Sequence, residues 1–182
     1  FRVCATQDIN IGHHTHSVAN VKRSLQYGAP TLIVFRDPKE AIPSYLSRFN
    51  KDPVEATLRY IRFYRYIRTV ADKVLLASFS EITSNVERTV QRVAAASGLR
   101  LDVGNPKTLE QRARSRMDRQ WSDAEDRLFN PRDIPLPNDE RQAAKKRARE
   151  RVLHLPLFDE AIREWNHMCR IARRSSHDSS PN

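Results

Sequence analysis

Short apolar runs bounded by turn residues predict two buried strands. Five successive β-forming residues, Thr31 to Phe35, lie between Pro30 and Pro38, and the run is too short for a helix. A second run, Val74 to Phe79, has the same character. Residues 1–12 alternate only weakly, which indicates one or two further short strands.

Helical spacing of apolar residues predicts helices around these strands. Residues 17–28 form a short helix that ends at Gly28, where a left-handed φ costs little. A long helix is expected from Pro53 to about Asp72. The helix after the second strand is expected to bury one side, made of Ile82, Val86, Val90, Val93 and Ser97.

The second half of the chain has a different character. Residues 102–138 are polar and interrupted by prolines, which predicts a loop-rich cover with a short helix at about Leu109 to Arg119. Two helices are expected next, at Asp139 to Leu153 and Leu157 to Ile171. Residues 173–182 are expected to be a disordered tail. We therefore expect one domain over residues 1–172.

The order strand, helix, strand, helix predicts an α/β fold: a parallel sheet in a three-layer arrangement, flanked by helices, with a helical C-terminal part. Ligands of such folds bind at the carboxyl ends of the strands. Three residues, His16, Arg36 and Phe79, fall near such ends. They are therefore candidates for one shared site.

The junction after the first strand has the features of an anion site. Asp37 is expected to cap the next helix, with Pro38 at its first position. Unpaired N–H groups and the positive end of the helix dipole then lie beside Arg36, a combination that attracts phosphate or sulfate. The Ser44 hydroxyl joins the same anion if the helix bends at Pro43. The spacing alone equally supports a structural junction with Arg36 in an ion pair.

The junction also resembles a known family. An apolar strand, Arg-Asp-Pro, a serine eight residues after the arginine and then an aromatic residue, here Arg36, Ser44 and Tyr45, resemble the 3′-phosphate-binding segment of sulfotransferases that use 3′-phosphoadenosine 5′-phosphosulfate (PAPS). The resemblance implies a P-loop NTPase-like sulfotransferase fold in which Arg36 and Ser44 hold the 3′-phosphate. It also implies transfer of a sulfuryl group, without a metal, to a hydroxyl or amine of a small-molecule or carbohydrate acceptor.

Two other stretches resemble the same family more loosely. Residues 11–17, Ile-Gly-His-His-Thr-His-Ser, are similar to its strand-end Lys-Thr-His element, whose histidine is the proposed general base. On this alignment His16 is the expected base and His14 its substitute. Residues 73–82 are similar to the strand that ends in Tyr-Glu-Asp-Leu, with Phe79 at the tyrosine position and thus near the adenine. A metal site at the histidines is less well supported, because no nearby cysteine or carboxylate completes a ligand set.

Two family signatures are missing. The sequence has no phosphate loop of the Pro-Lys-Ser-Gly-Thr-Thr kind and no Arg-Lys-Gly motif. Because the chain begins with Phe1, we expect the loop to lie upstream and the fold to be N-terminally incomplete. A fragment of this kind is expected to bind nucleotide poorly and need not be active.

The net charge of +10 and the pI of about 10.1 favour acidic partners, whether a nucleotide or a nucleic acid. Two basic stretches, the arginines of residues 59–68 and Lys145 to Arg149, keep open a non-enzymatic nucleic-acid-binding protein. Each stretch is more simply a solvated helix face. The other alternative is a nucleotide or small-molecule kinase of a related phosphate-loop fold, in which Arg36 clamps a phosphoryl group.

Composition narrows the class of protein further. The two cysteines, Cys4 and Cys169, lie far apart and form neither a disulfide framework nor a metal-ligand cluster. No apolar run is long enough to span a membrane, and no signal peptide is visible. These features favour a cytoplasmic protein.

Overall fold

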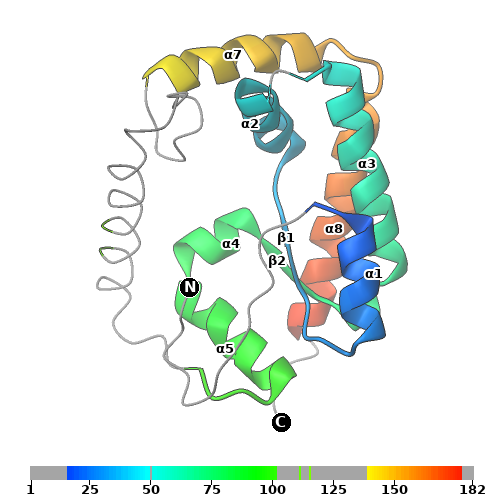
Figure 1. Ribbon diagram of the computed structural model, residues 1–182, viewed down its shortest axis with the longest axis vertical. Helices are drawn as coiled ribbons and strands as arrows, with labels where there is room; N and C mark the ends of the chain where they lie inside the picture. Colours follow the sequence, from blue (N-terminus) through cyan, green and yellow to red (C-terminus); the bar gives the residue numbers. More distant parts are fainter. Residues whose placement is uncertain (1–15, 50, 102–110, 112–114, 116–138, 178–182) are drawn as a thin grey trace.

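The structure, a computed structural model, describes residues 16–49, 51–101, 111, 115 and 139–177. This part of the chain is mostly helical, with a small parallel sheet near its centre (Figure 1). The elements are, in order, α1 (Val18–Gln26), β1 (Leu32–Phe35), α2 (Pro38–Phe49), α3 (Pro53–Thr69), the 3-10 turn η1 (Ala71–Lys73), β2 (Leu75–Ser78), α4 (Phe79–Ser84), α5 (Val86–Ser97), α7 (Asp139–Leu153) and α8 (Phe158–His177). Helices combined with parallel strands agree with the expected α/β class.

Strands β1 and β2 both lie where the apolar runs predict them. They pair in parallel, from Leu32 opposite Leu75 to Phe35 opposite Ser78. The connection between them contains α2 and α3, because parallel neighbours need a long crossover. The described residues contain these two strands, so a wider three-layer sheet stays a prediction.

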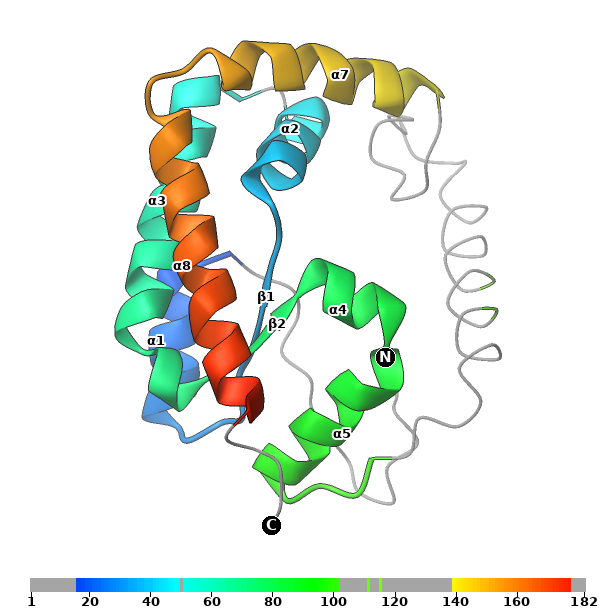
Figure 2. The ribbon, with the colours of Figure 1, turned by 180° about the vertical axis from the view of Figure 1, so that it is seen from behind.

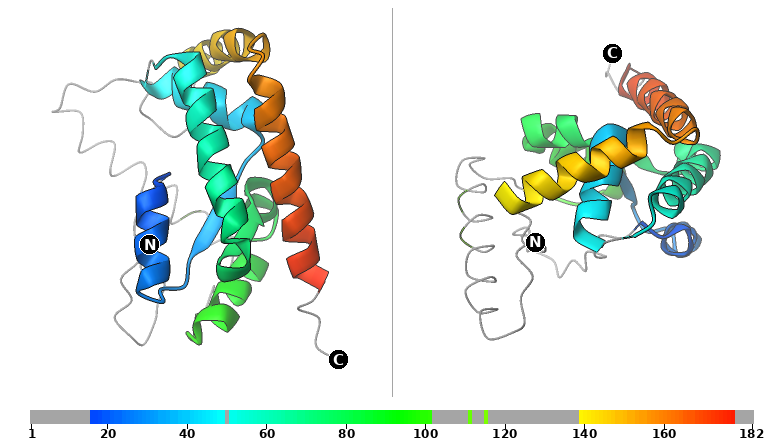
Figure 3. Two further views of the ribbon diagram at one scale, coloured as in Figure 1. Left: turned by 90° about the vertical axis from the view of Figure 1, so that its right-hand side faces the viewer. Right: turned by 90° about the horizontal axis from the view of Figure 1, so that it is seen from above.

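Helices lie on both sides of the strands. Figures 1 and 2 show α1, α3 and α8 along one side, and α4 with α5 along the other. Helices α3 and α8 run side by side in the same direction, as the left view of Figure 3 also shows. The core forms where α3 and α8 meet the sheet, around the fully buried Ile67, Leu76 and Met168.

Charged residues fix α3 to α8. Glu164 is only 5% exposed, and its carboxylate lies 3.3 Å from both Arg65 Nε and Arg68 Nη1. Arg65 also pairs with Glu160. Arg65 and Arg68 belong to the arginines that were expected to form a solvated face of α3. They instead hold α3 to α8, because a buried carboxylate requires cationic partners.

Helix α2 begins as its sequence predicts. The Asp37 carboxylate accepts a hydrogen bond of 2.8 Å from the N–H of Lys39, and Pro38 is the first helical residue. Pro43 lies buried inside a helix that continues to Phe49. The short helix before β1 ends near Gly28, which has the expected positive φ of 63°.

The segment after β2 differs from its expected form. It contains two helices, because Asn85 ends α4 and caps α5, accepting a 2.9 Å hydrogen bond from the N–H of Arg88. Ile82 therefore belongs to α4. The expectation that Val86 is buried was wrong: it is 42% exposed, whereas Thr89 is 5% exposed.

The C-terminal helices are longer than expected in one place. Helix α7 has the predicted bounds, and α8 continues to His177, into the stretch that was expected to begin the tail. The expected strands in residues 1–12 lie outside the described residues, and so does the end of the tail. Of the loop-rich cover, only Gln111 and Ser115 are described, and both are helical.

Candidate anion site at the carboxyl edge of the sheet

The strand register brings Arg36 and Phe79 together. Phe35 is opposite Ser78, so the next residue of each strand leaves the sheet at the same edge. The Arg36 guanidinium carbon lies 4.5 Å from the centre of the Phe79 ring, in cation–π contact. Phe79 is nevertheless 43% exposed, and Arg36 is partly accessible. Two of the candidate residues thus form one accessible, positively charged surface.

Two buried tyrosines of α3 hold the end of β1. The Tyr60 hydroxyl donates a 2.7 Å hydrogen bond to the Arg36 carbonyl, and the Tyr64 hydroxyl donates to the Val34 carbonyl at 3.4 Å. Burial raises the pKa of both tyrosines, so both remain protonated donors. The backbone that carries Arg36 is therefore fixed by the core.

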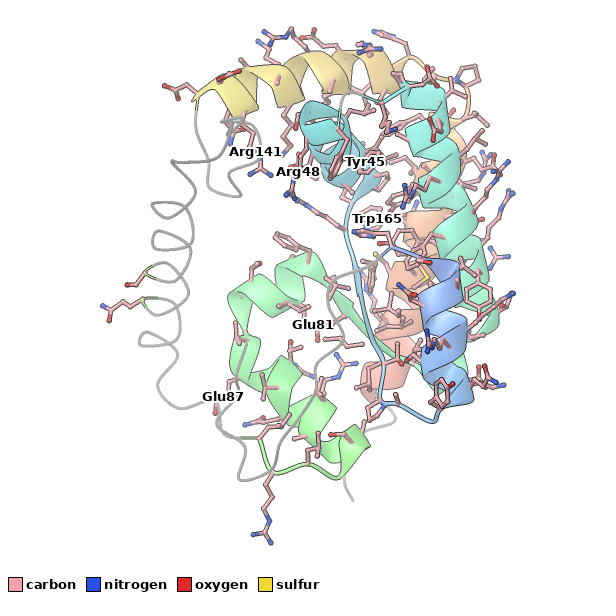
Figure 4. All side chains as sticks on the ribbon, in the orientation of Figure 1. Tyr45, Arg48, Glu81, Glu87, Arg141 and Trp165 are labelled. Carbon is pink, nitrogen blue, oxygen red and sulfur yellow. The ribbon has the colours of Figure 1, made fainter. Side chains whose placement is uncertain are left out.

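Helices α4 and α5 are tied to the other strand. Arg92 of α5 lies 2.9 Å from the Glu81 carboxylate and donates a 2.9 Å hydrogen bond to the Leu76 carbonyl. Glu81, labelled in Figure 4, belongs to the same short helix as Phe79. These contacts hold that helix, and with it the Phe79 backbone, at the end of β2.

The Arg36 side chain runs along α2 toward Glu40. Its Nη2 lies 3.4 Å from the Glu40 carboxylate, one helical turn further on. Arg36 thus makes the ion pair expected of a structural junction, while its side chain stays 34% exposed. The two readings of the junction are compatible in this geometry.

Glu40 has two further cationic neighbours, both from α7. Lys145 Nζ lies 2.5 Å from its carboxylate, and Arg149 Nη1 lies 3.9 Å away. The hydrogen bond from Lys145 holds the pKa of Glu40 below its usual range, and the charges of Lys145, Arg36 and Arg149 add to the effect against the opposing influence of burial. Helix α7 lies across α2, as the right view of Figure 3 shows, so these contacts join two helices.

Ser44 lies one turn beyond Glu40 on the same helix. Its carbonyl accepts a 3.0 Å hydrogen bond from the Ser47 hydroxyl, while within the described residues its own hydroxyl makes no hydrogen bond. The helix does not fold back at Pro43, so Ser44 is not in contact with Arg36. A rise of roughly 10 Å separates Asp37 from Ser44. An anion between Arg36 and Ser44 therefore occupies the position that Glu40 fills in this structure.

More positive charge gathers beneath α7. Figure 4 shows the side chains of Arg48 and Arg141 close together in this region. Burial, together with the guanidinium groups of Arg48 and Arg36, lowers the pKa of Arg141. Neither Arg141 nor Lys145 was predicted to belong to the site. Their spacing with Arg149, four residues each time, is the signal that places all three on one helix face.

His16 lies against α3. Its ring meets the Phe63 ring edge-on, with 5.9 Å between the ring centres. A hollow of about 290 Å³ adjoins it, lined by His16, Val18, Glu55, Leu58, Arg59, Arg62 and Phe63. Arg59 donates a 3.2 Å hydrogen bond to the hydroxyl of Tyr45, the residue after Ser44. The hollow thus lies between the start of α1 and α3, and Arg59 links its lining to α2 through Tyr45. The described contacts of the His16 ring do not include Arg36 or Phe79. His14 lies outside the described residues.

Other kinds of site find little support in the described part of the chain. No group of three or more His, Cys, Asp or Glu residues is placed there to hold a metal ion. Cys169 is a free thiol whose pKa is raised by burial, which makes it a poor nucleophile. None of the helices in these ranges has both the length and the apolar character needed to cross a membrane.

Comparison with family models, curated proteins and solved structures found no match for this chain. Its function is therefore inferred from its own residues.

Proposed function

We propose that this chain is part of a sulfotransferase that moves a sulfuryl group from PAPS to a hydroxyl or amine acceptor. The observation that best supports the proposal is the position of Arg36: at the carboxyl edge of a parallel sheet, fixed by Tyr60, and directed along α2 toward the turn that carries Ser44. On this proposal β1 and β2 belong to the wider three-layer sheet of a P-loop NTPase-like fold.

Each donor-binding residue has a definite role in the proposal. Arg36 and the Ser44 hydroxyl bind the 3′-phosphate, because a guanidinium and a neutral donor suit a phosphate monoester. Phe79 offers its partly exposed ring to the adenine. These contacts position the donor and do not take part in bond making.

His16 is the proposed general base, with His14 as the alternative. A neutral imidazole accepts the proton of the acceptor as the acceptor oxygen or nitrogen attacks sulfur. The bond from sulfur to the phosphate oxygen breaks, and adenosine 3′,5′-bisphosphate leaves. The hollow beside His16 is the proposed place for the acceptor. Full turnover by His16→Ala would move this role to His14 or remove it.

The test of the proposal is a calorimetric titration of adenosine 3′,5′-bisphosphate into the complete wild-type protein and into its Arg36→Ala variant. We expect Arg36→Ala to bind about tenfold to a hundredfold more weakly, the size of one lost charge-assisted contact. Equal affinity of the two proteins for the bisphosphate would contradict the assignment of Arg36 to the 3′-phosphate. Preference for ATP with Mg²⁺ over the bisphosphate would favour the kinase alternative. Salt-dependent oligonucleotide binding that survives Arg36→Ala would favour a nucleic-acid-binding protein.

A further inference from the structure

The contact between α2 and α7 has an imbalance of charge. In the part of the chain that the structure describes, the single carboxylate of Glu40 pairs with three cations, Arg36, Lys145 and Arg149. One negative charge faces three positive charges, so the group as a whole is positive. Because the side chains of Lys145 and Glu40 are only 22% and 37% exposed, water screens this charge incompletely.

The cations of α7 are held in place by packing. Ala148 and Val152 are buried in the core, and they fix the helix face on which Lys145 and Arg149 also lie. Positively charged groups on a fixed element lose little freedom when an anion binds. The group is therefore pre-organised for a ligand of opposite charge.

The position of Glu40 indicates what this ligand replaces. Glu40 lies one turn after Arg36 and one turn before Ser44, whose hydroxyl is unused within the described residues. A phosphate monoester carries up to two negative charges where Glu40 carries one. It therefore balances the three cations better than the carboxylate does.

We propose that Lys145 and Arg149 of α7 bind, together with Arg36, a phosphate monoester for which Glu40 is the displaceable internal counter-ion. The inference rests on the proposed function only in naming the nucleotide 3′-phosphate as the source of this group. Binding then exchanges one ion-pair network for another between the same two helices. The ligand thereby strengthens the contact of α7 with α2, while Glu40 limits the affinity.

The test compares charge removals on the same helix. Adenosine 3′,5′-bisphosphate is titrated into the wild-type chain, Lys145→Ala, Lys145→Arg and the matched control Lys146→Ala, whose side chain is exposed one residue away. We expect Lys145→Ala to bind about tenfold more weakly, and Lys145→Arg and Lys146→Ala to bind within about twofold of wild type. Circular dichroism checks that each variant is folded, and the Glu40→Gln variant provides an independent test if Lys145→Ala does not fold.

The Glu40→Gln variant is expected to change the affinity for the bisphosphate in the opposite direction. Removing the competing charge is expected to tighten bisphosphate binding by about threefold or more. If Glu40 instead serves only to orient Arg36, the same variant binds more weakly, and the counter-ion role is overturned.

Inorganic pyrophosphate, as a second probe, separates this inference from the proposed function. Weaker bisphosphate binding in Arg36→Ala but not in Lys145→Ala overturns the role of α7 and leaves the sulfotransferase proposal standing. If the bisphosphate and pyrophosphate bind equally well to wild type, and Lys145→Ala loses both, the anion site is supported but the nucleotide is excluded as its specific ligand. A wild-type chain that binds neither probe overturns the inference.

Discussion

At the scale of single residues, Arg36 is held from two sides. Its carbonyl accepts a hydrogen bond from the buried Tyr60, and its guanidinium lies over Phe79 and against Glu40. Local sequence could predict the junction, because Asp37 and Pro38 are strong signals for a helix start. It could not predict the Tyr60 contact, which joins residues 24 positions apart.

Tyr60→Phe tests how firmly the junction is held. The change leaves the Arg36 carbonyl without its donor in a partly buried place, so the free energy of unfolding is expected to fall by about 1 to 2 kcal/mol. Tyr45→Phe is the control, because its hydroxyl accepts from Arg59 in an exposed contact, and a loss below about 0.5 kcal/mol is expected. Urea unfolding measures both. Equal losses in the two variants would contradict the positioning role of Tyr60.

At the scale of elements, the pairing of α2 with α7 is the feature that the sequence did not reveal. The bounds of α7 could be predicted from its helix-forming residues and its charged character. The solvated-face prediction was wrong for Lys145, which is 22% exposed and pairs with a carboxylate 105 residues earlier. Periodicity reports which residues share a helix face, but it does not report what packs against that face. The same limit explains why Val86 was wrongly expected to be buried: its apolar side chain is only partly covered by neighbouring residues.

The α2–α7 contact is expected to depend on pH through Glu40. The pKa of Glu40 is lower in the folded chain than the unfolded value of about 4.3. The ionised carboxylate therefore stabilises the folded state fully above about pH 4.3, and this stabilisation is lost as the pH falls through the folded pKa. Wild type should therefore be more stable than Glu40→Gln at pH 7, with the difference shrinking as the pH falls below about 4.3 and vanishing below the lower, folded pKa of Glu40.

Urea midpoints measured between pH 3 and pH 7 follow this difference. Glu150→Gln, an exposed change on α7, is the control and should change stability little at any pH. A Glu40→Gln difference that stays constant over the range would show that charge does not hold the two helices together.

At the scale of the whole molecule, the full sequence carries a net charge of +10, and within the described residues the unbalanced positive charge is distributed unevenly. Arg65 and Arg68 of α3 pair with acidic residues of α8. These two of the four arginines in residues 59–68 are therefore less available to a polyanion. Cations outnumber their carboxylate partner where α2 meets α7, next to the carboxyl edge of the sheet. A positive overall field attracts anions, and on the proposed function this local excess is expected to bind a compact phosphate rather than an extended nucleic acid.

The parts of the fold that depend on local sequence signals could be predicted. Two strands and the start of α2 follow from apolar runs and capping residues. Convergence of Arg36 with Phe79 follows from the rule that parallel strands share a carboxyl edge. The part that the α7 cations play depends on the contact of Lys145 with Glu40, 105 residues away in the sequence, and it became visible only in the structure.

The central claim is that Arg36 recognises a nucleotide 3′-phosphate, and one binding comparison tests it most directly. Adenosine 3′,5′-bisphosphate and adenosine 5′-monophosphate differ only in that group, and each is titrated into wild type and Arg36→Ala. We expect wild type to bind the bisphosphate at least about tenfold more tightly than the monophosphate, and Arg36→Ala to lose most of this preference. Equal wild-type affinities, or the same preference in Arg36→Ala, would contradict the claim.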